Sequence, residues 1–588
     1  MSDPLDQLIS ILSKQQKTLV IEKSLSTYIN SLIPFSNLKS KTNILDVYWF
    51  EKNSIKTILE STSQNITFLI KSNLSNLELL QEFIHDLINF NPSYKIDLIL
   101  TQDYFKSFKI KLSQHGLIGD LNSINSWLIY IQQDSTIQLY LDELNSLYLY
   151  KNSNIPFKLA QWVHNYLLKN PEIRITHILA KGLNSSKFVS IWKNLNNNYI
   201  SSLSPLDKKQ YLKIDQGLYG SNTNNSGKQC DLIVLERNLD FLSVLLNQLT
   251  YSGIIDELYD IDINSIKLDD EFFNLNEEED SLYDSIKFKN FGEACDELNT
   301  QAKELQSNYN DLQSQSTISQ VKQFVDNLPH LESLKKQVSN HTKLSESILT
   351  QLETNDEFSK FNILLEFQQD IILQNLTYSS IISKILELIY EDNYSFEELI
   401  RLISITSIIY NGIREKDYIQ LNNEILEFFG FQNFQILQNL IKIGLITIRG
   451  DPSIIKNFNN LNLKLNLVPN DDDPLGFAYR GYIPLITRIL EQTISTTKRS
   501  SWDHLDLKSL ILGKTIDEEL TQDNIGLGGL LQKNSIVIIV MIGGLTYSEL
   551  ATIKKLEKLI KEKTGVEKKF IVVTDSFINA KKLINSNK

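Results

Sequence analysis

Few residues in this sequence have the types and spacing that catalysis requires. Gly513, Lys514 and Thr515 form a GKT triplet of the kind found in phosphate-binding loops. The full loop needs a glycine five residues before Gly513, and Lys508 stands there, with no apolar strand leading into the segment. The stretch GSNTNNSGKQ at 220–229 has a different spacing and ends in glutamine. Nucleotide binding at the GKT triplet is therefore not expected, and the stretch at 220–229 is interpreted as a flexible loop ahead of the strand at Asp231.

The histidines, cysteines and serines also lack a catalytic or metal-binding pattern. No two of the seven histidines have ligand spacing on one helix, and no GxSxG nucleophile elbow occurs. Cys230 and Cys295 lack the CxxC or CxxH spacing that zinc sites and redox motifs use. His341 lies between two apolar positions of a helical pattern and is interpreted as a packing or capping residue. We therefore expect no enzyme activity, no cofactor and no metal site.

One motif has a clear structural mechanism. In GGLTYSEL at 543–550, Thr546 and Glu549 have the T-x-x-E spacing of a capping box, in which each side chain accepts from the other residue's backbone N–H. The two glycines allow a tight exit from the apolar strand before them. The pattern predicts a strand, a turn and a helix, and a phosphate cradle at the helix N-terminus is the less favoured alternative. LIVLE at 232–236 is interpreted as a strand end, because a magnesium-holding acid there would need a phosphate loop.

The composition excludes several classes of protein. The 588 residues contain 58 Lys and Arg against 71 Asp and Glu, which gives a net charge of −13. This balance argues against nucleic acid as the main partner and against adsorption to anionic lipid, because both need clustered positive charge. The N-terminus lacks the pattern of a signal peptide, and the longest apolar run, 536–542, is too short to span a membrane. We expect a soluble cytosolic chain with no direct membrane insertion.

The elements that must position any site follow an α/β pattern interrupted once. Apolar runs predict strands at 18–21, 44–50, 66–70, 96–100, 127–131, 173–180 and 231–235. Such strands separated by helical patterns are typical of a parallel sheet covered on both faces. From about 256 to 460 the pattern is almost entirely helical, opened by an acidic stretch at 269–280 that is interpreted as a solvated loop. Strands return at 535–541 and 570–574, so one α/β domain is predicted to be split by a helical insert.

Within the insert, two heptad-like stripes predict a helical hairpin. The first consists of Leu298, Ala302, Leu305, Tyr309 and Leu312. The second consists of Leu331, Leu334, Val338, Leu344, Ile348 and Leu352. Pro329 lies in the second half, where it should end or kink a helix. The hairpin is interpreted either as a structural coiled-coil arm or as a groove that pairs with partner helices.

Four blocks, in order along the chain, resemble the Sec/Munc-type (SM) regulators of SNARE-mediated membrane fusion. The blocks are CDLIVLERNLDFLSVLLNQLTYSGIIDELYDI at 230–261, EELIRLISITSIIYNGIREKDYIQLNNEILEFFGFQNFQILQNLIKIGLI at 397–446, YRGYIPLITRILEQ at 479–492 and the GGLTYSEL motif. QLTYSGIIDE together with YRGYIPL is most similar to the vacuolar branch of the family. The chain departs from the usual pattern at Glu236, at Ser243–Val244 and at Ser252.

The resemblance implies the fold. SM proteins form an arch of three domains, with two parallel-sheet α/β domains and a large, mainly helical insert that carries a projecting helical hairpin. Domain one would be 1–132, domain two 133–250 with 485–588, and domain three 251–484, with the hairpin at about 285–352 and the later helical part at about 361–460. The split of domain two agrees with the interrupted strand pattern.

The resemblance also implies a function without catalysis. SM proteins bind the helical motifs of SNARE proteins and template their assembly into a parallel bundle, so Qa- and R-type SNAREs are the implied partners. A hairpin that holds two poorly ordered helices in register would lower the cost of helix nucleation. A proline in the second half of the family's hairpin marks a bend, and Pro329 in NLPHLESL matches it. Leu328, Pro329 and Leu331 are therefore expected to contact SNARE helices.

The vacuolar branch implies a second partner. Its members are subunits of the HOPS and CORVET tethering complexes and dock on an α-solenoid subunit, vacuolar protein sorting protein 16. The matching positions here are Asn422, Phe431 and Phe434. Two exposed phenylalanines would anchor such an interface, and the alternative that both are core residues stays open. The chain would then be cytoplasmic and reach vacuole or late-endosome membranes through its partners.

Two competing interpretations remain at this point. One is an SM protein of another trafficking step. The other, from a different class, is a nucleotide-dependent α/β enzyme with a helical lid, for which the GKT triplet and the strand–turn–helix elements are the support.

Overall fold

The computed structural model describes residues 4–585, apart from 60–62, 73–74, 102–105, 128, 142–143, 209–227, 269–270, 278–279, 314–317, 353–358, 392–393, 471, 495–501 and 521–535. The chain divides into two compact units. Unit one comprises Met1–Gln132, Gln138–Leu141 and Ile261–Leu275, and unit two comprises Gln133–Ile137, Asp142–Asp260 and Asn276–Lys588. None of the helices in the described residues is long and apolar enough to cross a membrane.

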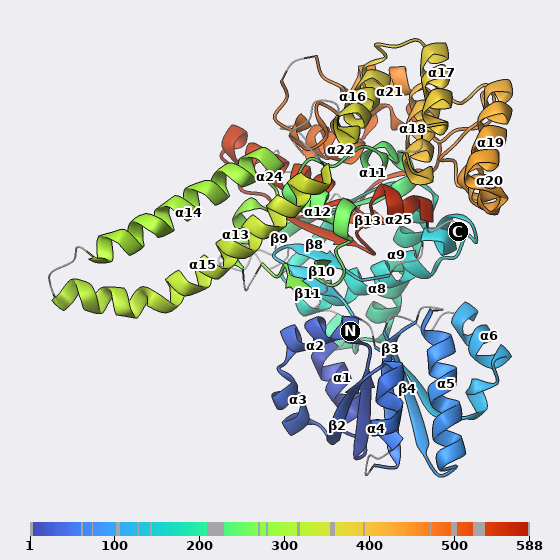
Figure 1. Cartoon of the computed structure of the whole chain (residues 1–588). Helices are drawn as coiled ribbons and strands as arrows, with labels where there is room; N and C mark the ends of the chain where they lie inside the picture. The colour runs from blue at the N-terminus through green and yellow to red at the C-terminus, as the bar shows by residue number, and fades with distance from the viewer. Residues whose placement is uncertain are drawn as a thin grey trace. The chain divides into compact units, whose positions relative to one another are not determined.

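Unit one is built on a five-stranded parallel sheet in the order β2-β1-β3-β4-β5 (Figure 1). Its strands are β1 (Lys17–Ile21), β2 (Ile44–Trp49), β3 (Asn65–Lys71), β4 (Lys95–Thr101) and β5 (Leu121–Trp127). Its helices are α1 (Pro4–Leu12), α2 (Ser26–Leu32), α3 (Phe35–Lys41), α4 (Ile55–Leu59), α5 (Ser75–Phe90) and α6 (Lys106–Gln114). The first four predicted strands are confirmed. The fifth was predicted at 127–131, which is wrong, because the edge strand β5 is polar and half-exposed and so has no apolar run.

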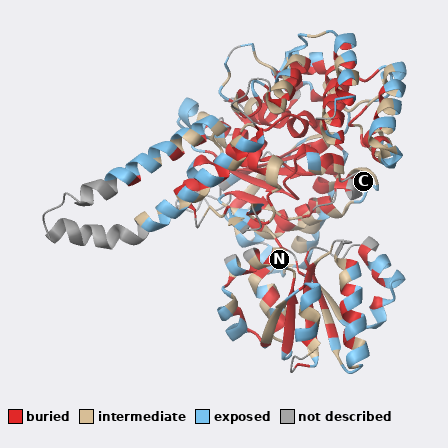
Figure 2. Ribbon diagram, in the orientation of Figure 1, coloured by how far each residue is buried: buried red, intermediate tan, exposed pale blue. Residues whose placement is uncertain are grey.

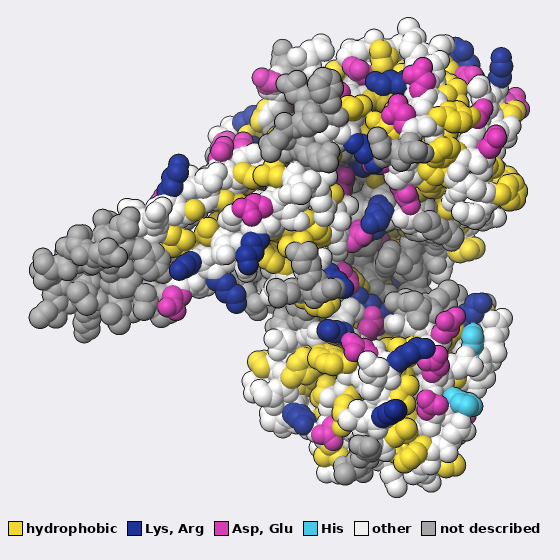
Figure 3. Space-filling view, in the orientation of Figure 1, with side chains coloured by type: hydrophobic (Ala, Val, Ile, Leu, Met, Phe, Trp, Pro, Cys, Tyr) yellow, Lys and Arg dark blue, Asp and Glu magenta, His cyan; other side chains and the backbone are white. Residues whose placement is uncertain are grey.

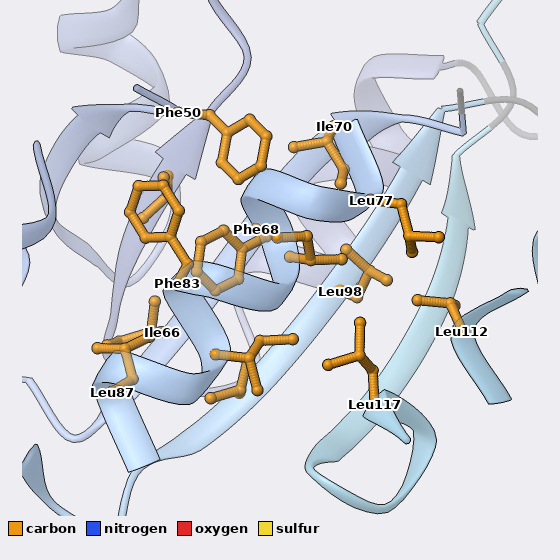
Figure 4. Packing of buried hydrophobic residues seen from close by; sticks show 14 of the residues in the cluster. Phe50, Ile66, Phe68, Ile70, Leu77, Phe83, Leu87, Leu98, Leu112 and Leu117 are labelled. Carbon is orange, nitrogen blue, oxygen red and sulfur yellow. The ribbon is translucent and has the colours of Figure 1, made fainter. Parts of the chain in front are cut away.

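Both faces of this sheet are buried, which explains the continuous apolar runs. Ile66, Phe68 and Ile70 of β3 point into one cluster, in which the rings of Phe68 and Phe83 meet edge to face at 5.6 Å (Figure 4). Leu69, the neighbour of Phe68 on the same strand, belongs to the cluster on the opposite face. This alternation is the signature of a sheet covered by helices on both sides.

The acidic stretch at 269–280 corrects the sequence interpretation. Instead of a solvated loop, it contributes β11 (Glu271–Asn274), which pairs antiparallel with β10 (Ser265–Leu268). It ends in Asp280, which is 8% exposed and accepts a hydrogen bond from the backbone N–H of Tyr283 at 2.9 Å. The sequence interpretation was wrong because it rested on the number of charged residues and left out the apolar residues that lie between them in the strand.

Unit two carries the second sheet, whose order is β12-β8-β9-β13-β14-β7-β6. The strands are β6 (Ile131–Gln133), β7 (Thr136–Gln138), β8 (Ile173–Lys181), β9 (Lys228–Glu236), β12 (Thr515–Glu519), β13 (Ile536–Ile542) and β14 (Lys569–Thr574). β8, β9, β13 and β14 are parallel neighbours, so β9 pairs directly with a strand that follows it by about 300 positions. The split α/β fold is therefore confirmed.

Helices cover this sheet and form the insert. Those that are close to the sheet strands in sequence are α7 (Leu144–Tyr148), α8 (Asn154–Lys169), α9 (Leu183–Ser202), α11 (Leu242–Leu245), α23 (Leu507–Leu510), α24 (Tyr547–Thr564) and α25 (Ala580–Asn585). The insert contains α12 (Tyr251–Tyr259), α13 (Ser281–Ile286), α14 (Phe291–Gln313), α15 (Ile318–Leu352), α16 (Lys360–Leu373), α17 (Tyr378–Ile389), α18 (Phe396–Ile409), α19 (Glu415–Phe429), α20 (Phe434–Lys442) and α21 (Phe458–Leu465). After the insert, α22 (Leu485–Ile494) packs against α24.

The predicted fold class is confirmed: two parallel-sheet α/β parts and a mainly helical insert with a hairpin. Within unit two, α14 and α15 lie side by side and extend away from the rest of the unit, and we call this pair the hairpin arm (Figure 1). The exact domain limits at 132/133, 250/251 and 484/485 stay a prediction.

Candidate functional site

The four sequence blocks meet in the interior of unit two. Arg237, which follows β9 in the first block, donates to both carboxylate oxygens of Glu549 in GGLTYSEL, at 2.7 and 2.8 Å. Both side chains are fully buried. Burial acts to lower the pKa of Arg237, but the neighbouring groups, with Glu549 first and Asp240 after it, together raise that pKa, so Arg237 stays ionised. This ion pair ties the first block to the last.

Glu549 also completes the predicted capping box of α24, which is confirmed. Its backbone N–H donates to Thr546 Oγ1 at 3.0 Å, and its carboxylate accepts from the Thr546 N–H at 2.9 Å. Thr546 Oγ1 also lies 2.7 Å from the hydroxyl of Tyr479 in the third block. Ser548, in the same turn, shares a 2.8 Å hydrogen bond with Thr250 of the first block.

A second buried carboxylate joins the first and third blocks. Asp240 accepts from Tyr482 Oη at 3.0 Å and from the backbone N–H of Leu485 at 2.9 Å. The second block is attached through Arg401, which donates to Glu257 at 2.9 Å and to the carbonyl of Leu245. These partners are the chain's own residues, so the recognisable blocks form a scaffold.

The carboxyl ends of the parallel strands are where α/β proteins bind phosphate, at helix N-termini and glycine-rich turns. Here the chain's own carboxylates occupy those backbone N–H groups. Glu236 accepts from Leu183 and Asn184 at 3.0 and 2.7 Å, at the start of α9. Asp575 accepts from Gly543 and Gly544 at 2.7 and 3.3 Å. A phosphate could reach these amides only by displacing a buried carboxylate.

Burial changes how readily the carboxyl groups of Glu236 and Asp575 ionise. It raises the pKa of Glu236, and it raises the pKa of Asp575 to about 7. Gly182 lets Glu236 approach, since its φ is +111° and a Cβ there would lie 2.3 Å from Glu236 Oε1. The interpretation of LIVLE as a strand end is therefore confirmed. Among the described residues, no three His, Cys, Asp or Glu side chains are grouped so as to hold a metal ion.

The GKT triplet belongs to the edge of the second sheet. Thr515 opens β12, which runs antiparallel to β8 and was not predicted because its sequence is polar. Lys181 donates to Gly513 O and to Thr515 Oγ1, both at 3.0 Å, and burial lowers the pKa of Lys181 to about 8. A lysine of the chain thus fixes the segment in which a nucleotide loop was considered.

The hairpin arm matches most of its predicted pattern. Val338, Leu344, Ile348 and Leu352 of α15 are buried, as expected. On α14, Leu298 and Leu305 are buried but Ala302 is exposed, so that position of the predicted seam is wrong. Exposed residues follow much of both helices in Figure 2. The side chains of Tyr309 and Leu312 lie outside the described residues.

The predicted SNARE-contacting residues lie on α15. Leu331 is half-buried. Leu328 and Pro329 are in the helical backbone of α15, but their side chains lie outside the described residues. The helix runs from Ile318 to Leu352 and does not end at Pro329. Contact between these residues and SNARE helices stays a prediction.

The predicted tether-binding residues lie around the end of α19. Phe431 is 73% exposed and Phe434 is 38% exposed, so the alternative that both are core residues is wrong. Their rings stack at 5.3 Å with an angle of 6°. Asn422 is half-buried, with its Oδ1 3.5 Å from Tyr418 Oη. Binding of a tether subunit here stays a prediction.

Two further aromatic side chains were missed from the sequence. Tyr390, at the end of α17, is 61% exposed and meets the ring of Phe428 edge to face at 6.2 Å. We call Tyr390, Phe428, Phe431 and Phe434 the aromatic surface. Figure 3 shows hydrophobic side chains gathered over α19 and α20. The FFGFQNF sequence carried the signal, because four phenylalanines within seven residues cannot all face one core.

Comparisons with known proteins agree with the sequence blocks. The family model described as the Sec1 family matches residues 17–586. Vacuolar protein sorting-associated protein 33 of Saccharomyces cerevisiae is 27% identical over 706 residues, covering 100% of this chain and 98% of that protein. The vacuolar protein-sorting-associated protein 33 homolog of Arabidopsis thaliana is 24% identical, covering 99% and 95%.

A solved structure shows the same fold. The SM protein Vps45 in complex with the Qa SNARE Tlg2 aligns with a TM-score of 0.57 at 14% identity, over 99% of this chain and 96% of that one. The resemblance stated from the four blocks is thereby confirmed.

Proposed function

Because the chain belongs to the Sec1 family, we propose that it promotes the assembly of SNARE complexes in vacuolar and endosomal membrane fusion, as the SM subunit of a HOPS- or CORVET-type tether. The observation that carries this proposal is the hairpin arm, in which α15 alone has 35 residues. Vps45, which has the same fold, is described in complex with a Qa SNARE. The protein acts by binding, with Qa- and R-type SNARE motifs as its partners.

The arm suits a template for helices that are disordered when alone. Such helices must order many residues before they gain contacts, and nucleation is the costly step. A preformed pair of helices offers a straight surface against which partner helices form with part of this cost removed. Leu328, Pro329 and Leu331 are the residues proposed to contact the SNARE helices.

Deletion of 291–350 tests the template. Binding of purified Qa- and R-type SNARE motifs, measured by calorimetry, is expected to fall at least tenfold, while the amide exchange of β9 and β13 stays unchanged. Leu331→Ala is the matching point variant, with the exposed neighbour Glu332→Ala as its control. Unchanged SNARE binding after the deletion would refute the template.

The aromatic surface is proposed to bind the tether's α-solenoid subunit, vacuolar protein sorting protein 16, through Asn422, Phe431 and Phe434. Exposed aromatic side chains that leave water on binding are the usual anchors of interfaces. This contact would bring a cytoplasmic chain to vacuole or late-endosome membranes through its partners. The chain is thus recruited peripherally.

The double variant Phe431→Asp, Phe434→Asp tests this surface. It should abolish co-purification of the solenoid subunit while leaving the circular dichroism spectrum unchanged. Phe90→Asp in unit one changes a phenylalanine whose exposure, 63%, lies between those of Phe431 and Phe434, and it should have no effect on binding of the solenoid subunit. A pull-down from the native cell distinguishes an SM protein of another step, which would retain a lone Qa-SNARE and no tether subunit.

A further inference from the structure

The hairpin arm leaves the rest of unit two at a defined turn of α15. From Val338 to Leu352, the last residue of α15, one face of the helix is buried. Between Leu331 and Gln337 the described side chains are half-buried or exposed. The turn between Val338 and His341 is therefore where the projecting part of α15 meets the rest of unit two.

His341 lies in this turn and is fully buried. Its Nδ1 lies 2.9 Å from Tyr251 Oη, and its Nε2 lies 3.1 Å from Asp280 Oδ2. Because a carboxylate accepts, Nε2 donates to Asp280, and Nδ1 shares a hydrogen bond with the Tyr251 hydroxyl. The imidazole ring also stacks on Tyr283 at 5.8 Å with an angle of 5°.

The two hydrogen-bond partners of His341 reach different elements. Asp280 caps α13, since its Oδ1 accepts from the N–H of Tyr283 at 2.9 Å. Tyr251 opens α12, and its backbone N–H donates to Lys289 O at 3.0 Å, just before α14 begins. The ring of Tyr251 stacks on Phe291, the first residue of α14. Both helices of the arm are therefore held at this one point.

The same point is connected to the sheet. Thr250, the N-cap of α12, accepts from the N–H of Gly253 and shares a 2.8 Å hydrogen bond with Ser548 at the start of α24. The QLTYSGIIDE sequence, which the proposed function leaves unexplained, thus links the arm to the helix that packs beside β14.

We propose that Tyr251, His341 and Asp280 form a positioning clamp that fixes the direction in which the hairpin arm leaves unit two, and that SNARE binding on the arm depends on this direction. The second part rests on the proposed function. Hydrogen bonds are directional, so a polar contact of three groups selects one orientation, where an apolar contact would tolerate sliding.

Geometry makes the direction matter. His341 lies 23 positions after Ile318 on the helix, which at a rise of about 1.5 Å per position is about 35 Å. A change of about 10° at His341 then moves the start of α15 sideways by about 6 Å, which is more than half of the about 8–10 Å that separates the axes of packed helices. A displacement of that size would separate partner helices from the arm.

The test uses His341→Phe, which keeps an aromatic ring against Tyr283 and removes both hydrogen bonds. Spin labels on the exposed residues Ser307, far along α14, and Lys555 report the direction of the arm within unit two. The distance distribution should broaden at least twofold in the variant, and binding of the Qa- and R-type SNARE motifs should fall at least tenfold. Co-purification of the solenoid subunit through the aromatic surface should not change.

His164→Phe is the matched control, because it removes another buried histidine of the same unit without touching the arm. A narrow, unchanged distance distribution in His341→Phe would overturn the clamp, even if the variant melts at a lower temperature. An altered distribution with unchanged SNARE binding would overturn the dependence of binding on direction. If the wild-type chain binds no SNARE motif, the proposed function fails, and the distance distribution alone decides the clamp.

Discussion

The buried ion pair between Arg237 and Glu549 allows a quantitative test of how the chain holds its sequence blocks together. Arg237→Met replaces the guanidinium by an apolar side chain and leaves the Glu549 carboxylate buried, with no cation beside it. Removing one partner of a buried pair costs about 3–5 kcal/mol, because the remaining charge is uncompensated. Arg237 also donates to the carbonyls of Gly544 and Asp240, so we expect the upper part of this range.

Glu549→Gln is the complementary change. The amide oxygen can still accept from the Thr546 N–H, so the cap of α24 is partly kept, but the amide nitrogen faces Arg237. The double variant leaves no uncompensated charge and should lose less than the sum of the two single variants. We expect a coupling free energy of at least about 2 kcal/mol.

Amide hydrogen exchange followed by mass spectrometry measures these changes in unit two alone. Peptides from β9 and β13 report the free energy of opening around the ion pair, and peptides from β3 and β4 in unit one serve as the internal control. The reasoning is wrong if Arg237→Met changes the opening free energy of β9 by less than about 1 kcal/mol. It is also wrong if the two single variants add without coupling.

Two more predictions concern buried groups of the same scaffold. Burial raises the pKa of Asp575 from 3.8 to about 7. Its contribution to the free energy of unfolding is therefore complete below about pH 4 and is lost as the pH rises through 7. The total loss is about 4 kcal/mol. Asp575→Asn cannot ionise, so denaturant midpoints measured from pH 5 to 8 should fall less for the variant than for the wild type, and parallel curves would contradict this. Gly253→Ala places a Cβ 2.7 Å from Ser548 Oγ, so the free energy of opening that protects the α24 amides from hydrogen exchange should fall by about 1–3 kcal/mol. Gly292→Ala is the control: the closest neighbour of its Cβ is 3.9 Å away, so the variant should not destabilise α14.

Most of the strands that the sequence predicted are buried on both faces. The exception is β2, an edge strand whose run ILDVYW is apolar but mostly half-buried. β3, β9, β13 and β14 have continuous apolar runs because helices cover each side of their sheets. β5 and β12 lie at sheet edges with exposed polar side chains, so they show no comparable run. Pairing with a neighbour, which one segment alone does not reveal, makes them strands.

The site was predictable in part, for a similar reason. The stripe on α15 has a local period, so Val338 to Leu352 could be identified. His341 fits the same stripe, but its partners Asp280 and Tyr251 are 61 and 90 positions away, and no local pattern joins them. Whether Phe431 and Phe434 are exposed depends on which side chains around the start of α20 are covered by neighbouring helices. The spacing of residues in the sequence does not show this.

The positions of the four blocks separate two tasks within one chain. Arg237 bonds Glu549 and the carbonyl of Asp240 in the interior, where Tyr482 also bonds Asp240 and Tyr479 bonds Thr546. Glu236 fills the helix N-terminus at which an α/β enzyme would bind phosphate. A carboxylate at that position repels a phosphate, so the crevice of the sheet is unsuitable for the ligand class that this fold usually takes there. The hairpin arm at 291–352 lies between the first and second blocks and overlaps neither. The residues that identify the family are thus those that hold the scaffold together, and the arm contributes no residue to the four blocks.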